Sequence, residues 1–202
     1  NIEKISNLNS NQLFETKKSS SEVNAKIILA GEHSVVYGGK ALCIPFNSMK
    51  MKITLEKEEH FLNASSLKTR KKLNSPNIIT ELINKALVLL NLPQYSFKKT
   101  IESNFLIGAG LGSSAALCLS ILRAVSLFFN RSLSLEEELE IANILEYRFH
   151  KTPSGLDTTS ISYNKAIEFC KKNGANPLKI GQPTFHNDSK STKWNFAIID
   201  SK

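Results

Sequence analysis

Residues 107–116, Ile-Gly-Ala-Gly-Leu-Gly-Ser-Ser-Ala-Ala, combine three glycines, two hydroxyls and the start of a long apolar run. Glycine lets the backbone approach a ligand closely, because no Cβ stands in the way. The run from Ala115 to Phe129 predicts a buried helix, and the free N–H groups at a helix N-terminus bind anions such as phosphate. No lysine precedes the serines as in Gly-x-x-x-x-Gly-Lys-Ser/Thr, so a cation must come from another segment. Taken alone, the segment also fits a glycine-rich hairpin beside a core helix.

A lysine inside an apolar strand is the second feature that bears on chemistry. Lys26 lies in the run Ala25-Lys26-Ile27-Ile28-Leu29-Ala30, where an unpaired ammonium would be costly. Its side chain therefore either reaches solvent or faces a carboxylate or phosphate. Glu32 and His33 follow at the end of the strand, before the turn at Gly38-Gly39. They either line a pocket or cap the turn.

Two carboxylates in different settings form the third feature. Glu146 is expected on a helix, whereas Asp157 comes just after the turn Thr152-Pro153-Ser154-Gly155. Such a pair can divide the work between a metal ligand and a proton acceptor. A surface glutamate and a turn-stabilising aspartate are the alternative when the segment is taken in isolation.

The elements that position these residues follow from hydrophobic periodicity. Alternation predicts strands at 23–30, 41–45, 49–55, 95–103, 159–169 and 196–199. Helical spacing predicts helices at 78–90 and 115–129, and the capping box of Ser134 and Glu137 starts another that reaches about His150. Residues 1–22 are expected as an arm or lead-in strand, and 60–77 as a loop or short-helix insertion. Strands and helices mix without a βαβ repeat, which favours an α+β fold.

Charge and cysteine usage narrow the class of protein. The 202 residues include 26 basic and 18 acidic ones, and the net charge of +8 suits anionic ligands. The one dense basic cluster, 68–72, has no interleaved aromatics, so we expect no nucleic-acid partner. Cys43, Cys118 and Cys170 lack metal-site spacing and predict reduced thiols in a cytoplasmic protein. The uncharged stretch from Ala115 is too short for a membrane span, because Arg123 interrupts it.

Together and in this order, the three segments resemble the GHMP small-molecule kinases, named for galactokinase, homoserine kinase, mevalonate kinase and phosphomevalonate kinase. The glycine loop is similar to that family's phosphate-binding second motif. Lys26 followed by residues 31–38 is most similar to the mevalonate kinases, as is the spacing from Glu146 through His150 to residues 153–157. The resemblance runs from about Val23 to Phe169. It implies an α+β N-terminal kinase domain, with a mixed or antiparallel sheet packed against helices as in a ribosomal-protein fold.

The resemblance also implies a role for each matching position. Asp157 matches the residue that accepts the alcohol's proton, and Lys26 matches the lysine that pairs with it and with the transferring phosphoryl group. Ser114 and Glu146 match the Mg²⁺ ligands. Glu32 and His33 fall where mevalonate binds, and Thr158 is expected beside them in the acid pocket. The residues expected to bind ATP are Ser103, Gly108, Ala109, Gly110, Leu111, Gly112, Ser113 and Ser114.

Several positions depart from the family pattern, and the sequence therefore does not decide which substrate the protein uses. Ile107 stands where proline is frequent, Lys151 replaces a glycine, Thr158 stands where asparagine is common, and Asn164-Lys165 replaces a glycine pair. A kinase for another small hydroxy acid or sugar therefore remains an alternative. So does a non-catalytic protein that only binds nucleotide.

The resemblance implies a division of the chain as well. An ATP-binding domain is expected over 23–195, preceded by the arm at 1–22 and followed at 196–202 by a junction to a second, C-terminal domain. The family's third glycine-rich motif is absent from this sequence. We expect the piece to fold alone but to turn over slowly or not at all, and its protein partner to be either a second copy or a separate C-terminal fragment.

Overall fold

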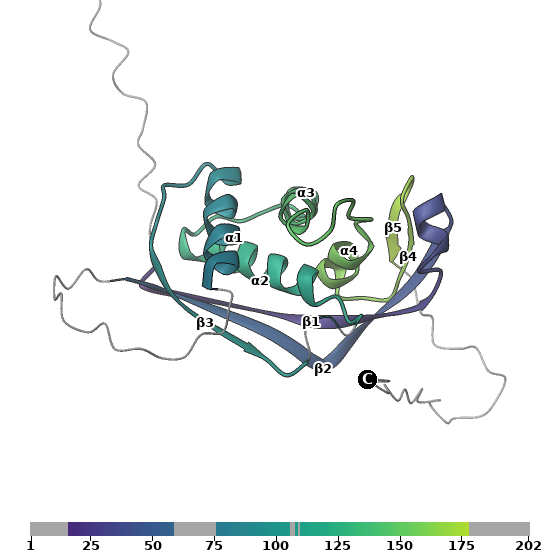
Figure 1. The fold of residues 1–202 in the computed structure, drawn as a ribbon, viewed down its shortest axis with the longest axis horizontal. Helices are drawn as coiled ribbons and strands as arrows, with labels where there is room; N and C mark the ends of the chain where they lie inside the picture. Colours follow the sequence, from purple (N-terminus) through teal and green to yellow (C-terminus); the bar gives the residue numbers. More distant parts are fainter. Residues whose placement is uncertain (1–15, 59–75, 106–107, 109, 178–202) are drawn as a thin grey trace, which may run out of the picture.

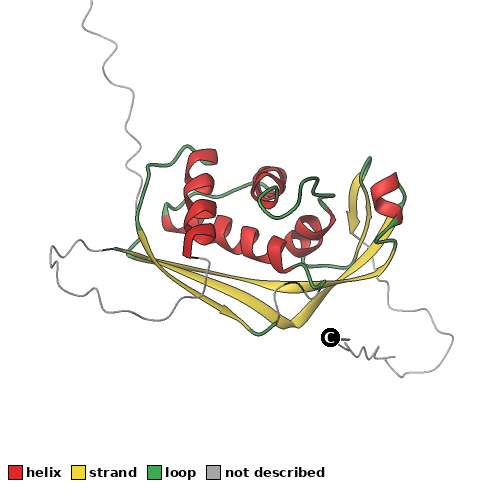
Figure 2. Cartoon of the chain, in the orientation of Figure 1, coloured by secondary structure: helices red, strands yellow, loops and turns green. Residues whose placement is uncertain are grey.

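A computed structural model describes residues 16–58, 76–105, 108 and 110–177. Over these residues an antiparallel sheet carries all four helices on one face, which confirms the α+β fold (Figures 1 and 2). The elements in chain order are β1 (Lys18–Ala30), a short 3-10 helix η1 (Ser34–Tyr37), β2 (Lys40–Lys57), α1 (Pro76–Leu89), β3 (Phe97–Ser103), α2 (Ser113–Phe128), α3 (Leu135–Glu146), α4 (Leu156–Tyr163), β4 (Ile167–Cys170) and β5 (Gly174–Pro177).

Strand β2 organises the sheet. Along one side it pairs with β1, and along the other it pairs with β3 through its C-terminal half and with β4 through its first residues. Strand β5 then pairs with β4. Between Asn24 and Ala25 the register of β1 shifts, because residues 47–49 of β2 have no partner there. Alternation along β1 continues past this shift, since Val23, Ala25 and Ile27 pack in the main core while Lys26 and Ile28 line a pocket. Ala25 and Lys26 are both buried, because both faces of the strand are covered there.

Helix α2 forms the centre of the core. It lies on the sheet with α1 and α3 against it (Figure 1). Ile121, Leu122 and Phe128 are fully buried there, as are Ile53 and Leu55 of β2. Each such side chain contributes about 1.5–3 kcal/mol through removal from water. The buried helix expected at 115–129 is thus confirmed. Its packing in the core holds in place the N-terminal end, where the glycine loop and Ser114 lie.

Several expected elements have different bounds in the structure. The helix at 78–90 is confirmed as α1, whereas the strands at 41–45 and 49–55 are one continuous strand, β2. Strand β1 already begins at Lys18, within the stretch expected as an arm or lead-in strand. Helix α3 begins as expected, since Ser134 Oγ accepts a hydrogen bond from the Glu137 N–H at 3.1 Å, but it ends at Glu146.

The strand expected at 159–169 is wrong. Residues 156–163 form helix α4, and only 167–170 form a strand. The β-branched residues Thr158, Thr159 and Ile161 have strand propensity, but all three are buried by neighbouring elements, and packing overrides propensity. As a result, Asp157 lies in the first turn of a helix instead of in a loop.

Some expectations fall outside the described residues. They include the first fifteen residues of the expected arm, the insertion from 60 to 75, the basic cluster at 68–72, Ile107, Ala109, and the segments at 196–199 and 196–202. Within the part of the chain that the structure describes, no helix has the length and apolarity that crossing a membrane requires.

Candidate active site

A pocket of about 360 Å³ lies where the three segments singled out in the sequence converge. Its walls come from β1, η1, the glycine loop, the end of α3 and the turn before α4. The lining residues are Lys26, Ile28, Glu32, Val35, Val36, Gly110, Glu146, His150, Thr152, Pro153, Ser154, Leu156 and Asp157. Segments more than a hundred residues apart in sequence thereby contribute to one cavity.

Lys26 and Asp157 form an ion pair within this pocket. The Lys26 Nζ lies 2.8 Å from Asp157 Oδ1 and also donates to the Gly110 carbonyl at 3.3 Å. Only 2% of the lysine side chain is exposed, against 29% of the aspartate. The backbone N–H of Lys26 also donates to the Leu111 carbonyl at 3.2 Å. The ammonium is thus fixed, while part of the carboxylate remains open to a substrate.

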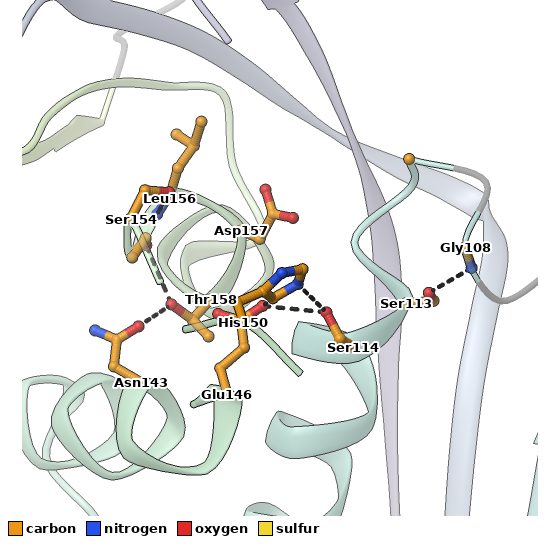
Figure 3. Close-up of polar contacts among 12 residues, drawn as sticks. Gly108, Ser113, Ser114, Asn143, Glu146, His150, Ser154, Leu156, Asp157 and Thr158 are labelled. Carbon is orange, nitrogen blue, oxygen red and sulfur yellow. Dashed lines mark hydrogen bonds and ion pairs between the residues drawn. The ribbon is translucent and has the colours of Figure 1, made fainter. Parts of the chain in front are cut away.

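The glycine loop packs tightly against this lysine. Gly112 has a φ of 75°, and a Cβ added there would lie 2.9 Å from Lys26 Cε. No side chain caps α2, whose first residues follow Gly112 directly. The unpaired N–H groups of its first turn are therefore available to an anion. Gly108, on the other side of the loop, donates its N–H to Ser113 Oγ at 3.0 Å (Figure 3).

Ser114 and Glu146 meet at what we call the Ser114–Glu146 wall, where Glu146 lines the pocket and Ser114, which is not a lining residue, hydrogen-bonds to it. Ser114 Oγ donates to Glu146 Oε1 at 3.2 Å and lies 3.2 Å from His150 Nε2 (Figure 3). Burial, followed by the nearby charge of Asp157, raises the pKa of Glu146 to about 7, although the Ser114 hydrogen bond opposes the shift. The charge of Lys26 also lowers the pKa of Glu146, but burial and Asp157 together outweigh it.

These two side chains fit a magnesium ion. A hydroxyl and a carboxylate are hard oxygen ligands, and Mg²⁺ completes its shell with water and phosphate oxygens. The described residues contain no cluster of three or more His, Cys, Asp and Glu side chains that could hold a metal by themselves. Ser114 and Glu146 would accordingly hold the ion together with a bound nucleotide.

Of the remaining expected site residues that the structure describes, Glu32 lines the pocket, whereas His33, Thr158 and Ser103 do not. His33 is exposed. Thr158 is fully buried and hydrogen-bonds to Asn143 of α3 (Figure 3). Ser103 is exposed and donates to the Phe105 carbonyl at 3.0 Å in a local turn. Ala109 lies outside the described residues.

Sequence reasoning did not assign roles to His150 and Asn143. His150 follows Glu146 by four residues and Asn143 precedes it by three, spacings that place side chains on one helix face. That periodicity around Glu146 was the available signal for both. The apolar wall of Val35 and Val36 had no such signal, because it depends on η1, which was not expected.

Comparison with known proteins agrees with this geometry. Residues 77–165 match the GHMP kinases N terminal domain. The mevalonate kinase of Methanocaldococcus jannaschii is 32% identical over 164 residues, which cover 73% of this chain and 52% of that protein. The crystal structure of mevalonate kinase from methicillin-resistant Staphylococcus aureus MRSA252 superposes with a TM-score of 0.63 at 37% identity, covering 81% of this chain and 56% of that one. For the Methanococcus jannaschii mevalonate kinase structure the TM-score is 0.67 at 26% identity, covering 85% and 57%.

The fold and the matches together place the chain among the small-molecule kinases, and the glycine loop, the buried lysine with its partly exposed aspartate and the Ser114–Glu146 contact are compatible with that class. The chain belongs to the GHMP kinase family and carries its N-terminal domain. It spans about half the length of the curated relatives it matches.

Proposed function

We propose that this chain takes part in transferring the γ-phosphoryl group of ATP to the primary hydroxyl of mevalonate, giving 5-phosphomevalonate. The observation that carries the proposal is the Lys26–Asp157 ion pair at 2.8 Å, set between the glycine loop and the Ser114–Glu146 wall. A protein that only binds nucleotide needs the loop but has no use for a partly exposed carboxylate held beside it.

Each group in the pocket has a role in such a transfer. The acceptor oxygen bonds to the γ-phosphorus as the bond between that phosphorus and the β,γ-bridging oxygen breaks, and ADP leaves. Asp157 takes the hydroxyl proton, since its carboxylate is the one open to the pocket and fixed by Lys26. Lys26 and the amides at the start of α2 offset charge on the phosphate oxygens. A magnesium ion at Ser114 and Glu146 would neutralise further charge on the phosphates.

Mevalonate is supported by the chemistry of the pocket and by the relatives. The end next to β1 and η1 offers the apolar side chains of Ile28, Val35 and Val36 beside the carboxylate of Glu32. A small acceptor with a branched aliphatic carbon and several hydroxyls can use both kinds of surface. The matched curated relatives are mevalonate kinases, which supports the same substrate for this chain.

The test is transfer of label from γ-labelled ATP to mevalonate, measured together with ATP affinity. Asp157→Asn should abolish transfer while leaving ATP affinity within about twofold, because the amide cannot take the proton. Glu140→Gln, which removes an exposed carboxylate of α3 away from the pocket, is the control and should retain transfer. Unchanged transfer by the Asp157 variant would overturn the role of proton acceptor.

A panel of acceptors tests the substrate separately. Galactose, homoserine and phosphomevalonate are offered to the same protein with ATP and magnesium. We expect mevalonate to give the highest kcat/KM. Faster transfer to a sugar or to another hydroxy acid would retain the kinase chemistry and reject mevalonate.

A further inference from the structure

Thr158 follows the proposed proton acceptor directly and points away from the pocket. Its side chain is fully buried, and its hydroxyl donates to Asn143 Oδ1 on α3 while lying 3.1 Å from the Gly155 carbonyl oxygen (Figure 3). The Asn143 amide also packs on the turn before α4, since a Cβ added at Gly155 would lie 3.4 Å from its Nδ2. Thr158 and Asn143 therefore join the start of α4 to the last turn of α3.

A second hydroxyl joins the same two helices at the other end of α4. Ser162 Oγ donates to Glu138 Oε1 of α3, and Arg123 of α2 donates to the same carboxylate at 2.6 and 2.8 Å. Helix α4 is therefore tied to α3 once in each of its two turns. Only the Thr158 contact lies in the turn that carries Asp157.

The two tied helices carry the two functional carboxylates. Glu146 follows Asn143 by three residues on α3, and Asp157 precedes Thr158 on α4. A rotation or slide of the first turn of α4 would change the separation of Asp157 from Glu146 and from Lys26. Two further contacts hold that turn: the ion pair of Asp157 with Lys26, and a hydrogen bond that the Leu156 N–H donates to Ser154 Oγ at 3.2 Å. Its N-cap, Gly155, has no side chain to add another.

We propose that Asn143 and Thr158 are positioning residues for the phosphoryl transfer, which set the orientation of Asp157 relative to the Ser114–Glu146 wall. The inference rests on the proposed function and assigns Thr158 to the geometry of the catalytic base instead of to substrate contact. Displacing a reacting group by about 1 Å can cost up to about a hundredfold in rate. Loss of the Asn143–Thr158 contact should therefore lower kcat without changing the residues that line the pocket.

The experiment compares two replacements of Thr158 in the label-transfer assay. Thr158→Val keeps the shape and removes the hydroxyl, whereas Thr158→Ser keeps the hydroxyl. We expect the valine variant to lose about tenfold in kcat with both KM values within about twofold of the starting protein. The serine variant should stay within about threefold in kcat.

Ser162→Ala is the matched control. It also removes one hydroxyl bond between α4 and α3, but one turn away from Asp157. If the Thr158 contact merely holds the fold, both variants will lower the thermal midpoint and affect kcat alike, which overturns the proposal. Selective loss of kcat in Thr158→Val at a temperature where all variants are folded supports it.

A double-mutant cycle identifies the partner. Asn143→Ala combined with Thr158→Val should lose no more kcat than the worse single variant, because both remove one contact. Additive losses would show that the residues act separately and would reject the pairing. If neither the chain alone nor the chain fused to the C-terminal half of the Staphylococcus aureus mevalonate kinase transfers label, the proposed function fails together with this inference. Normal transfer by Thr158→Val rejects the inference alone.

Discussion

A buried lysine needs a partner, and Lys26 has few. The sequence left open whether its ammonium reaches solvent or faces an anion. In the structure it faces Asp157 and the Gly110 carbonyl. The exposures of the two partners differ, at 2% for Lys26 and 29% for Asp157, so loss of either one has different consequences.

Stability tests this asymmetry. Asp157→Ala leaves a buried ammonium with only a carbonyl partner, and we expect the free energy of unfolding to fall by about 3 kcal/mol. Lys26→Met fills the same space with an apolar chain and leaves a carboxylate that water can reach, so its loss should be smaller by at least about 1 kcal/mol. Urea denaturation of both variants measures the difference. Equal losses would contradict the inferred burial of the ammonium.

The cysteines provide a second test at this scale. Cys43 and Cys118 are fully buried, and burial raises the pKa of both thiols, that of Cys43 to about 11. Cys170 is half-buried, with its thiol 3.5 Å from the Gly38 carbonyl. At pH 8 a disulfide reagent should thus modify one thiol in the native protein and three after unfolding. Cys170→Ser should abolish the native reaction, and two or more reactive native thiols would contradict the packing around Cys43 and Cys118.

At the scale of elements, the glycine loop and β1 are interlocked. Gly112 has a positive φ and sits against Lys26, so the loop can reach α2 only because no side chain stands at this position. Gly110 also has a positive φ, at 74°, but nothing lies within 4 Å of the place where its Cβ would be. A substitution at Gly110 therefore introduces backbone strain alone, whereas one at Gly112 introduces both backbone strain and a clash with Lys26.

Substituting each with alanine measures both effects. Gly110→Ala should lower the free energy of unfolding by about 1 kcal/mol, the cost of a left-handed conformation for an L-residue. Gly112→Ala adds an overlap with the Lys26 stem, and we expect a further loss of about 1–3 kcal/mol. Thermal and urea unfolding of the two variants give the values. If they prove equally stable, the close packing of the loop on Lys26 is contradicted.

Elements defined by their own residues were predictable, and those defined by neighbours were not. Helix α2 follows from its continuous apolar run, and the start of α3 follows from the Ser134 cap. Helix α4 was missed because its β-branched residues favour a strand until packing against α3 buries them. The three segments of the site were found from residue types, but the Lys26–Asp157 and Asn143–Thr158 contacts depend on packing that periodicity does not record.

At the scale of the whole molecule, the net charge of +8 favours an anionic ligand, and the pocket lies on one domain of about half the length of its relatives. The described residues supply a partly exposed carboxylate, a buried ammonium, a helix N-terminus and a hydroxyl beside a second carboxylate. Under the proposed function, these groups bind the phosphates of ATP. Rapid transfer additionally requires that water be excluded and that the nucleotide be held in one orientation.

We therefore expect the 202-residue chain to bind ATP and to turn over at least about a hundredfold more slowly than a full-length mevalonate kinase, because proximity and orientation contribute rate factors of that size. The assay compares the chain alone with the chain fused to the C-terminal half of the Staphylococcus aureus relative. The fusion should raise kcat, and an Asp157→Asn fusion should not. Full-rate transfer by the chain alone would contradict the prediction, and it would mean that the groups around Lys26 and Asp157 suffice to orient ATP without a second domain.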